Sequence, residues 1–329
     1  MDPRVSLALR CARGKAVPAA VLAERAELRP ERVAEAVADL EAAGFGIESH
    51  PHQGYRLLEP PVGLLAEEVG YDLDTGRIGR VVRCVDGATS TNDLAWQAAE
   101  EGREAADGLA IFAEYQTAGR GRRGNRWLAP PHSSILCSIV LWVPTAPGRE
   151  GVLTRGVALA AAHAIEGESA LEVGIRWPND LVIDDRKVGG ILVEARPGGS
   201  AAALAVLGIG INVAQPLEAF PANLLPGATS LAMAGASTDR TLLARALLER
   251  LEGVFRQMAE PGGAQEISRA VEARCRTLGR RITVRAGSET AHGEVVALDP
   301  DYGLVLRLES GAVRRFPAMT THVVPQGGM

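Results

Sequence analysis

The sequence predicts a multidomain protein that combines helices and strands, of the α/β or α+β class. At 329 residues the chain is longer than one hydrophobic core usually serves. β-patterned and helical runs alternate in its central part, as in an α/β core, and short β-patterned runs occupy its C-terminal part. We therefore expect three domains, at residues 1–60, 65–275 and 279–326.

Residues 1–60 show three helical patterns followed by a hairpin. The helical patterns cover residues 5–11, 19–27 and 31–43. The third starts at Pro30, a favoured first helical position, and its apolar residues recur at i, i+4 and i+7 on one face. Residues 45–58 form two short extended runs joined by a turn rich in Pro and Gly. This order predicts a winged helix-turn-helix.

The central region predicts a mixed sheet packed with helices. Residues 59–63, Glu-Pro-Pro-Val-Gly, are a stiff linker before it, because consecutive prolines favour an extended chain. Strand patterns cover residues 80–85, 109–115, 134–141, 181–184, 190–194 and 204–213, and helical patterns cover 92–101, 151–164 and 240–258. The later β-runs 281–285, 293–297 and 304–308 predict a small C-terminal β-barrel.

Composition and charge exclude several classes of protein. Hydrophobic residues make up 47% and charged residues 23%, which is ordinary globular usage and not disorder. The net charge of −5 gives no overall attraction to nucleic acid or anionic membranes. No apolar run reaches the roughly 18 residues of a membrane span, and no signal peptide is visible. The four cysteines form no zinc or disulfide pattern. We therefore expect a cytoplasmic protein with no membrane segment and no protein-bound metal.

Four arginines and three glycines fall within nine residues after a predicted strand. They are Gly119, Arg120, Gly121, Arg122, Arg123, Gly124, Asn125, Arg126 and Trp127, called the arginine loop below. Glycine lets backbone N–H groups approach an anion and arginine adds a forked cationic donor, so the loop suits a phosphate or acyl phosphate. It is neither a Walker A loop nor a dinucleotide-binding fingerprint. Taken alone, a solvated basic loop or a nucleic-acid-binding tail is about as plausible.

Two polar segments have both a structural and a ligand-binding interpretation. Ser90, Thr91 and Asn92 follow a strand and open a helix. This is the pattern of an N-cap, and it also presents hydroxyls and an amide to a polar planar ligand. Asn179 and Asp180 lie in a Pro-Asn-Asp sequence between two apolar runs, which is typical of a turn.

Lys187 and two glycines lie in strongly apolar strands. Lysine is rarely buried without a partner, so we expect Lys187 to face an anion. Gly208 and Gly210 weaken a strand unless a ligand or another backbone approaches closely. A tightly packed strand crossing explains these glycines equally well.

In this order, the five segments closely resemble those of the biotin-protein ligases. They are Ser90-Thr91-Asn92, Gln116 with the arginine loop, Arg-Trp-Pro-Asn-Asp at 176–180, Lys-Val-Gly-Gly-Ile-Leu-Val-Glu at 187–194, and Gly-Ile-Gly-Ile-Asn at 208–212. With its N-terminal segment, the chain resembles the bifunctional kind that acts as ligase and biotin-operon repressor. The resemblance covers nearly all of the chain. It implies a class II synthetase-like core and a C-terminal SH3-like barrel.

The resemblance implies two half-reactions. Biotin and ATP, with Mg²⁺, give biotinyl-5'-AMP and pyrophosphate. Biotin then passes to one lysine of the biotin carboxyl carrier protein of acetyl-CoA carboxylase. The resemblance also implies operator DNA as a partner, and a homodimer that pairs its central sheets edge to edge.

The resemblance further implies roles for individual residues. The catalytic set is Lys187, Arg120, Arg122 and Asp180. Lys187 touches the biotin carboxyl and the α-phosphate, the two arginines cover the acyl phosphate, and Asp180 orients or deprotonates the carrier lysine. The substrate-binding set is Ser90, Thr91, Asn92, Gln116, Gly119, Arg120, Gly121, Arg122, Arg123, Gly124, Trp127, Asn179, Lys187, Gly208, Gly210 and Asn212. Within it, Ser90, Thr91 and Gln116 surround the ureido ring, and Asn179 and Asn212 hold ATP.

Three segments depart from the family's pattern. After Trp127 relatives commonly have Ser-Pro-x-Gly, whereas residues 128–132 read Leu-Ala-Pro-Pro-His. Residues 228–231 contain no tryptophan to cover adenine, and residues 316–322 lack the usual acidic and arginine-bearing ending. Nucleotide contacts from the third domain therefore have no support in the sequence.

The N-terminal domain has no excess of basic side chains. Eight basic and nine acidic side chains give residues 1–60 a net charge of −1, whereas DNA-binding domains are usually basic. The expected recognition helix has Arg29 and Arg32 near its start, among several acidic residues. Either these two arginines suffice for operator contacts, or the domain serves another use, such as organising the active-site loop.

Two other functions compete with this one. A lipoate-protein ligase has the same fold and adenylation chemistry, but the arginine loop and the neutral Ser/Thr/Gln set favour biotin. A non-enzymatic, biotin-sensing repressor would not require Lys187, Asp180 and the arginine loop together.

Overall fold

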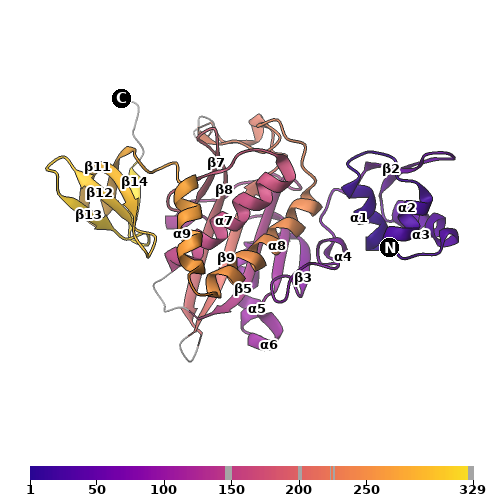
Figure 1. The fold of residues 1–329 in the computed structure, drawn as a ribbon, viewed down its shortest axis with the longest axis horizontal. Coiled ribbons are helices and arrows are strands. Elements are labelled where there is room, and N and C mark those ends of the chain that lie inside the picture. Colours follow the sequence, from indigo (N-terminus) through magenta and orange to yellow (C-terminus); the bar gives the residue numbers. More distant parts are fainter. Residues whose placement is uncertain (145–149, 199–201, 223, 225–226, 325–329) are drawn as a thin grey trace.

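The computed structural model describes residues 1–144, 150–198, 202–222, 224 and 227–324. It has three parts in a row, with N-terminal helices at one side, an α/β part in the middle and C-terminal strands at the other side (Figure 1). Residues 325 and 326, which end the third predicted domain, lie outside the described residues. Within those ranges no helix is long and apolar enough to cross a membrane.

Three helices and a hairpin form the N-terminal part, in the predicted order. They are α1 (Pro3–Cys11), α2 (Ala19–Arg25), α3 (Pro30–Ala42), β1 (Gly46–His50) and its antiparallel partner β2 (Gly54–Glu59). The Asp2 side chain caps α1 by accepting from the backbone N–H of Arg4 at 3.0 Å. Leu9, Leu22 and Leu40 are fully buried in a core separate from that of the central sheet. This part can therefore pack as a unit of its own.

A seven-stranded mixed sheet is the centre of the molecule. Its strands run in the order β3 (Val82–Ala88), β4 (Ala110–Gln116), β5 (Ser134–Val143), β9 (Ala203–Asn212), β8 (Arg186–Pro197), β7 (Asp180–Ile183) and β6 (Gly174–Arg176). β3 and β4 are parallel, and every other neighbouring pair is antiparallel. The mixed sheet predicted from the sequence is confirmed.

Helices cover both faces of this sheet. One face carries α7 (Glu150–Ser169), α8 (Arg240–Ala259) and α9 (Gly263–Arg274), and the other carries α5 (Thr91–Ala99) and α6 (Arg103–Ala106) (Figure 1). Every residue of β5 is buried, because its alternate side chains enter two separate cores. Ile139 and Leu141 belong to the core of α7 and α8, whereas Val140 and Trp142 belong to that of α5.

Five antiparallel strands form the C-terminal part. Their order is β13 (Val313–Phe316), β12 (Leu304–Leu308), β11 (Glu289–Leu298), β10 (Arg281–Ala286) and β14 (Thr321–Val324). No ladder within the described ranges joins β13 to β14, so closure into a barrel stays a prediction. The fully buried Tyr302 packs in the core shared with the central part. Its carbonyl accepts from the Trp177 indole N–H at 2.7 Å, which ties this sheet to the segment before β7.

Among the described residues, six α-helices and strands lie outside the predicted set: α4 (Ala66–Val69), α6, α9, β6, β13 and β14. All except α9 span three or four residues, which is too short for a period to be visible. In α9, Ile267 and Val271 are the only large side chains that are buried, so its apolar stripe is faint in the sequence.

A buried ion cluster joins the N-terminal part to the central part. The Arg10 guanidinium of α1 donates to Glu68 of α4 at 2.8 and 2.7 Å, and to Asp239 at 2.8 Å. The Arg10 and Glu68 side chains are 2% and 0% exposed. Asp239 is also the N-cap of α8, where it accepts from the backbone N–H groups of Thr241 and Leu242. One guanidinium therefore connects α1, α4 and the first turn of α8.

We expect Glu68→Ala to lower the free energy of unfolding by about 3–5 kcal/mol, because it leaves the buried Arg10 charge without its main partner. Arg13→Ala is the matched control, since the Arg13 side chain, paired with Glu168, is 57% exposed. That pair should contribute no more than about 1 kcal/mol. Denaturant unfolding measures both variants, and equal losses would contradict a structural role for the buried cluster.

Candidate active site

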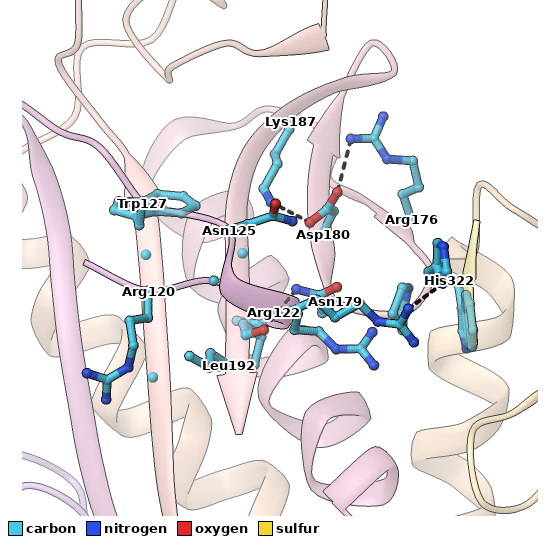
Figure 2. A pocket seen from close by; sticks show the side chains of 18 of the residues that line it. Arg120, Arg122, Asn125, Trp127, Arg176, Asn179, Asp180, Lys187, Leu192 and His322 are labelled. Atoms are coloured by element: carbon cyan, nitrogen blue, oxygen red, sulfur yellow. Dashed lines mark hydrogen bonds and ion pairs between the residues drawn. The ribbon is translucent and has the colours of Figure 1, made fainter. Parts of the chain in front are cut away.

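A cavity of about 760 Å³ lies between the central sheet, the arginine loop and the C-terminal sheet. Figure 2 shows its side chains, with Lys187 and Asp180 pointing toward one another and Trp127 lying beside them. The predicted site residues that line it are Ser90, Thr91, Asn92, Gln116, Arg120, Gly121, Arg122, Arg123, Trp127, Asn179, Asp180, Lys187, Gly208 and Gly210. These residues come from five segments that are well separated in the sequence. The fold therefore brings all but three members of the predicted set into one cavity.

The three others support the cavity from behind. The Asn212 amide donates to the Thr229 carbonyl at 2.9 Å and is buried. The Gly119 carbonyl accepts from the Trp127 backbone N–H at 2.9 Å. Gly124 has a φ of 75°, a left-handed conformation that favours glycine at this bend. The structure thus gives Asn212, Gly119 and Gly124 positions beside the cavity and not on its wall.

One end of the cavity offers uncharged hydrogen-bonding groups. Oε1 of Gln116, at the end of β4, accepts from the backbone N–H of Thr91 at 2.7 Å, and the Thr91 hydroxyl lies 3.2 Å from the same oxygen. Oγ of Ser90 caps α5 by accepting from the backbone N–H of Asn92 at 3.3 Å. The N-cap interpretation of this segment is confirmed, and the same residues still face the cavity.

Asn92 makes its side-chain contacts inside the protein. Its Nδ2 donates to Oε2 of Glu194 at 2.7 Å, and its Oδ1 lies 2.6 Å from Oγ of Ser138. Only 3% of the residue is exposed. The sequence predicted direct substrate binding by Asn92, but both ends of its amide already have protein partners.

Carboxylates hold Arg120 at the edge of the cavity. Its guanidinium is 2.6 Å from Oδ1 of Asp93 and 3.7 Å from Oε2 of Glu194. Figure 2 shows the side chain pointing away from Lys187 and Asp180. The Arg120 and Asp93 side chains are 38% and 42% exposed, so solvent screens this ion pair.

The other loop arginines contact the C-terminal part. Arg122 donates to the Ala318 carbonyl at 2.5 Å, and Arg123 contacts Nδ1 of His322. Burial and the neighbouring Arg123 charge lower the pKa of Arg122. Desolvation and the Arg123 charge also lower the pKa of His322. Both pKa shifts disfavour positive charge where cations are crowded, and an anion bound between them would relieve that crowding.

Lys187 faces a carboxylate, as the sequence predicted for an anion. Its Nζ is 2.6 Å from Oδ1 of Asp180, whose Oδ2 is 3.1 Å from Arg176. The ammonium also lies 5.6 Å from the centre of the Trp127 ring. The chain contains only two lysines, Lys15 and Lys187, and uses arginine at its other basic positions. Lys187 is therefore a position where the chain has a compact ammonium, which differs in shape and hydrogen-bonding geometry from a planar guanidinium.

The strand glycines are sites of close approach, and the approaching groups are side chains. A Cβ at Gly210 would lie 2.6 Å from the Trp127 ring. One at Gly208 would lie 2.4 Å from Oδ1 of Asn92. The sequence left a ligand, another backbone or strand packing as explanations, and the structure shows that packed site residues occupy the space.

The wall nearest the C-terminal part is basic and, apart from Arg176 of the Arg-Trp-Pro-Asn-Asp segment, was not predicted. It contains Arg176, Arg276, Thr277, Arg280, Arg281, Ile282 and His322. The other arginines are scattered in the sequence and lie outside the five segments of the resemblance, so they were not identified from the sequence. The C-terminal part lines the cavity even though its sequence departs from the expected ending. Within the described residues no cluster of three or more His, Cys, Asp or Glu suits a metal ion.

Two family models match the chain. Residues 85–212 match the Biotin/lipoate A/B protein ligase family, and residues 277–320 match the Biotin protein ligase C terminal domain. The chain is 34% identical over 227 residues to the bifunctional ligase/repressor BirA of Escherichia coli strain K12, covering 69% of this chain and 68% of that protein. The protein of the same name from Salmonella typhimurium is 32% identical over 249 residues, covering 75% of each chain.

Solved structures share the fold. The biotin protein ligase from Aquifex aeolicus in complex with biotin and ATP matches with a TM-score of 0.61 and 24% identity, over 74% of this chain and 98% of that one. The apo structure of that ligase gives a TM-score of 0.61 and 21% identity, over 74% and 98% of the two chains. The matched sequence models, the relatives and the shared mixed-sheet fold agree, and this chain belongs to the biotin protein ligase family.

Proposed function

We propose that this chain activates biotin with ATP and transfers it to a carrier lysine. A biotin carboxylate oxygen attacks the α-phosphorus of ATP, which gives biotinyl-5'-AMP and releases pyrophosphate. The amine of a lysine on the biotin carboxyl carrier protein of acetyl-CoA carboxylase then attacks the acyl carbon, loses a proton and releases AMP. The observation that carries the proposal is the cavity, which places neutral hydrogen-bonding groups beside Lys187 and the arginine loop.

The two ends of the cavity match the two ends of biotinyl-5'-AMP. Ser90, Thr91 and Gln116 are uncharged donors and acceptors, which suit the N–H and C=O groups of a ureido ring. Lys187 and the arginine loop supply positive charge for the carboxylate and the α-phosphate. These anions repel each other as they approach, so a cation between them lowers the barrier by stabilising the developing charge.

Arg120 has to change partner for this chemistry. In the structure it pairs with Asp93 at 2.6 Å, and both side chains are partly exposed. A pair of this kind contributes little stability, roughly 0–1 kcal/mol, so a bound acyl phosphate can replace Asp93 at small cost. Arg120 then turns from the rim toward Lys187 and covers the phosphate.

Asp180 serves the second half-reaction in this proposal. Its two oxygens face Lys187 and Arg176 at 2.6 and 3.1 Å. When Lys187 moves to the bound anion, Oδ1 of Asp180 is left at the cavity and can orient the incoming carrier ammonium and accept its proton. A carrier lysine must lose that proton before it can act as a nucleophile.

Mg²⁺ would reach the cavity together with ATP. Among the described residues that line the cavity, Asp180 is the only carboxylate, and it already has two cationic partners. Mg²⁺ prefers octahedral oxygen ligands and often takes them from phosphates and water. The described lining residues therefore supply no metal cage, and the nucleotide phosphates would hold the ion and have their charge reduced by it.

We also propose a biotin-responsive repressor role for the N-terminal part, as a winged helix-turn-helix. Its helices and hairpin have the required order, and two exposed arginines lie at the start of α3, Arg29 as its N-cap and Arg32 in its first turn. Arg32 pairs with Glu35 at 3.1 Å. We also propose that two copies of the chain pair their central sheets edge to edge as a homodimer. We place this activity in the cytoplasm.

We expect labelled pyrophosphate to exchange into ATP in the presence of biotin, and not in the presence of lipoate. The neutral groups at Ser90, Thr91 and Gln116 match a cyclic urea, and a dithiolane ring would leave them unpaired. Labelling of the carrier by lipoate alone would refute the biotin assignment. Biotin binding without any exchange would identify a sensor without ligase activity.

Lys187→Arg should slow adenylate formation by about a hundredfold or more, because a planar guanidinium cannot place a compact charge between the two reacting anions. Lys15→Arg is the matched control, since it changes the only other lysine of the chain and lies in the exposed segment after α1. Single-turnover formation of biotinyl-5'-AMP measures the effect. A normal rate for Lys187→Arg would remove lysine 187 from the chemistry.

The joint substitution Arg29→Ala and Arg32→Ala should abolish biotin-dependent repression and leave ligation intact. These arginines are the cations near the start of α3, where a recognition helix contacts DNA. Substitution is preferable to deleting residues 1–60, because deletion would leave the buried Glu68 without Arg10. Transcription of biotin-synthesis genes with and without biotin gives the readout, and unchanged repression would contradict the role.

A further inference from the structure

We propose that Ser138, Asn92 and Glu194 form a hydrogen-bond chain that makes the Thr91 hydroxyl an acceptor for a ring N–H of the ligand. This inference rests on the proposed function, in which the ligand is a cyclic urea. It assigns Ser138 and Glu194 as positioning residues that determine specificity without touching the substrate.

The contacts of the chain run from the edge of the sheet to the cavity. Oε2 of Glu194 accepts from Nδ2 of Asn92 at 2.7 Å. Oδ1 of Asn92 lies 2.6 Å from Oγ of Ser138, and that hydroxyl lies 2.7 Å from Oγ1 of Thr91. Ser138 is 0% exposed, and Asn92 and Thr91 are 3% and 4% exposed. Bulk water therefore cannot substitute for a missing partner in the middle of the chain.

Counting protons and comparing distances gives the direction of each bond. Ionised Glu194 only accepts, so the Asn92 amide must present its NH₂ to Glu194 and its oxygen to Ser138. A carbonyl oxygen cannot donate, so the single hydroxyl proton of Ser138 lies toward Asn92. Oγ of Ser138 must then accept from the Thr91 hydroxyl. That hydroxyl lies 2.7 Å from Ser138 and 3.2 Å from Oε1 of Gln116, so its single proton lies toward the nearer acceptor, Ser138, and none is left for a ligand.

Oγ1 of Thr91 consequently presents lone pairs to the cavity and can act there as a hydrogen-bond acceptor. The backbone N–H of Thr91 can only donate, which fixes Oε1 of Gln116 next to it at 2.7 Å and leaves the Gln116 NH₂ group as the donor end. Oγ of Ser90 accepts from the Asn92 backbone N–H, so its own proton is available to a ligand. The cavity thus presents one acceptor and two donors, which matches a ring N–H beside a carbonyl.

Neighbouring groups hold the far end of the chain in place. The Trp96 indole N–H also donates to Oε2 of Glu194, at 3.1 Å. The Arg196 guanidinium stacks 4.0 Å from the Trp96 ring centre. On the other side, a Cβ at residue 208 would lie 2.4 Å from Oδ1 of Asn92, so Gly208 is required for the amide to fit. The orientation of Asn92 is therefore set by packing as well as by charge.

Ser138→Ala in the full-length protein tests the chain. It should raise KM for biotin about tenfold in biotin-dependent pyrophosphate exchange, with KM for ATP changed less than about twofold. Ser134→Ala is the matched control, because Ser134 lies on the same strand, is 1% exposed, and its hydroxyl has no hydrogen-bond partner among the described residues. It should leave both KM values unchanged. Equal behaviour of the two variants would overturn the inference.

N-methylated biotins separate a directed hydrogen bond from a general packing defect. Methylation of the ureido nitrogen that faces Thr91 removes the proton that Thr91 accepts. In the wild-type protein one of the two N-methyl isomers should therefore bind much more weakly than biotin. In Ser138→Ala that discrimination should fall about tenfold, because the Thr91 hydroxyl loses its 2.7 Å partner and keeps only the longer, 3.2 Å contact with Oε1 of Gln116 to hold its proton. An unchanged ratio would refute the directed chain even if KM for biotin rises.

The partly exposed Glu194 gives a second break in the chain if Ser138→Ala folds poorly. Its side chain is 33% exposed, and Glu194→Ala removes the group that orients Asn92. The same loss of discrimination between biotin and its N-methyl isomers is expected, and full discrimination would contradict the chain. Absence of biotin-dependent exchange in the wild-type protein would instead refute the proposed function itself.

Discussion

The site depends on three glycines, Gly190, Gly208 and Gly210, at which the central sheet lacks side chains. Gly190 of β8 lies directly opposite Gly210 of β9, and Gly208 of β9 lies opposite Ser138 of β5. Elsewhere these strands bear buried apolar side chains that fill the space against the helices. These glycines leave room above the sheet for the Asn92 amide and the Trp127 ring, which a Cβ at Gly208 or Gly210 would strike. The cavity exists because these positions lack side chains, and a locally weaker strand is the cost of using glycine there.

The charged groups are arranged around these glycines by the β7–β8 hairpin and by the C-terminal sheet. Asp180 is the register partner of Gly190, so the hairpin holds its carboxylate at the edge of the floor, and Lys187 reaches it from the same hairpin. Arg122 bonds to the Ala318 carbonyl and so ties the arginine loop to the C-terminal part. Binding, charge stabilisation and closure of the cavity therefore come from different elements that meet at one place.

The sequence predicted the order of the elements and most of the cavity wall, because each of those features is a local pattern. An N-cap, a glycine-arginine loop and a lysine in an apolar strand can be recognised from neighbouring residues alone. Pairings between distant segments left no such signal. Ser138 looks like a polar interruption of a buried strand, and its partners Thr91 and Asn92 are nearly fifty residues away. The contact between Asn92 and Glu194 is still more distant in the sequence, and direct substrate binding by Asn92 stays a prediction.

The central claim is that one cavity holds both reacting groups of the biotin–AMP anhydride. A crystal structure with a non-hydrolysable analogue of biotinyl-5'-AMP tests it most directly. We expect the ureido ring to lie against Thr91 and Gln116, and the phosphate analogue to lie against Lys187. Arg120 should turn away from Asp93 and cover the phosphate analogue. A ligand bound with its ring at the arginine loop, or a phosphate analogue that leaves both Lys187 on Asp180 and Arg120 on Asp93, would contradict the account.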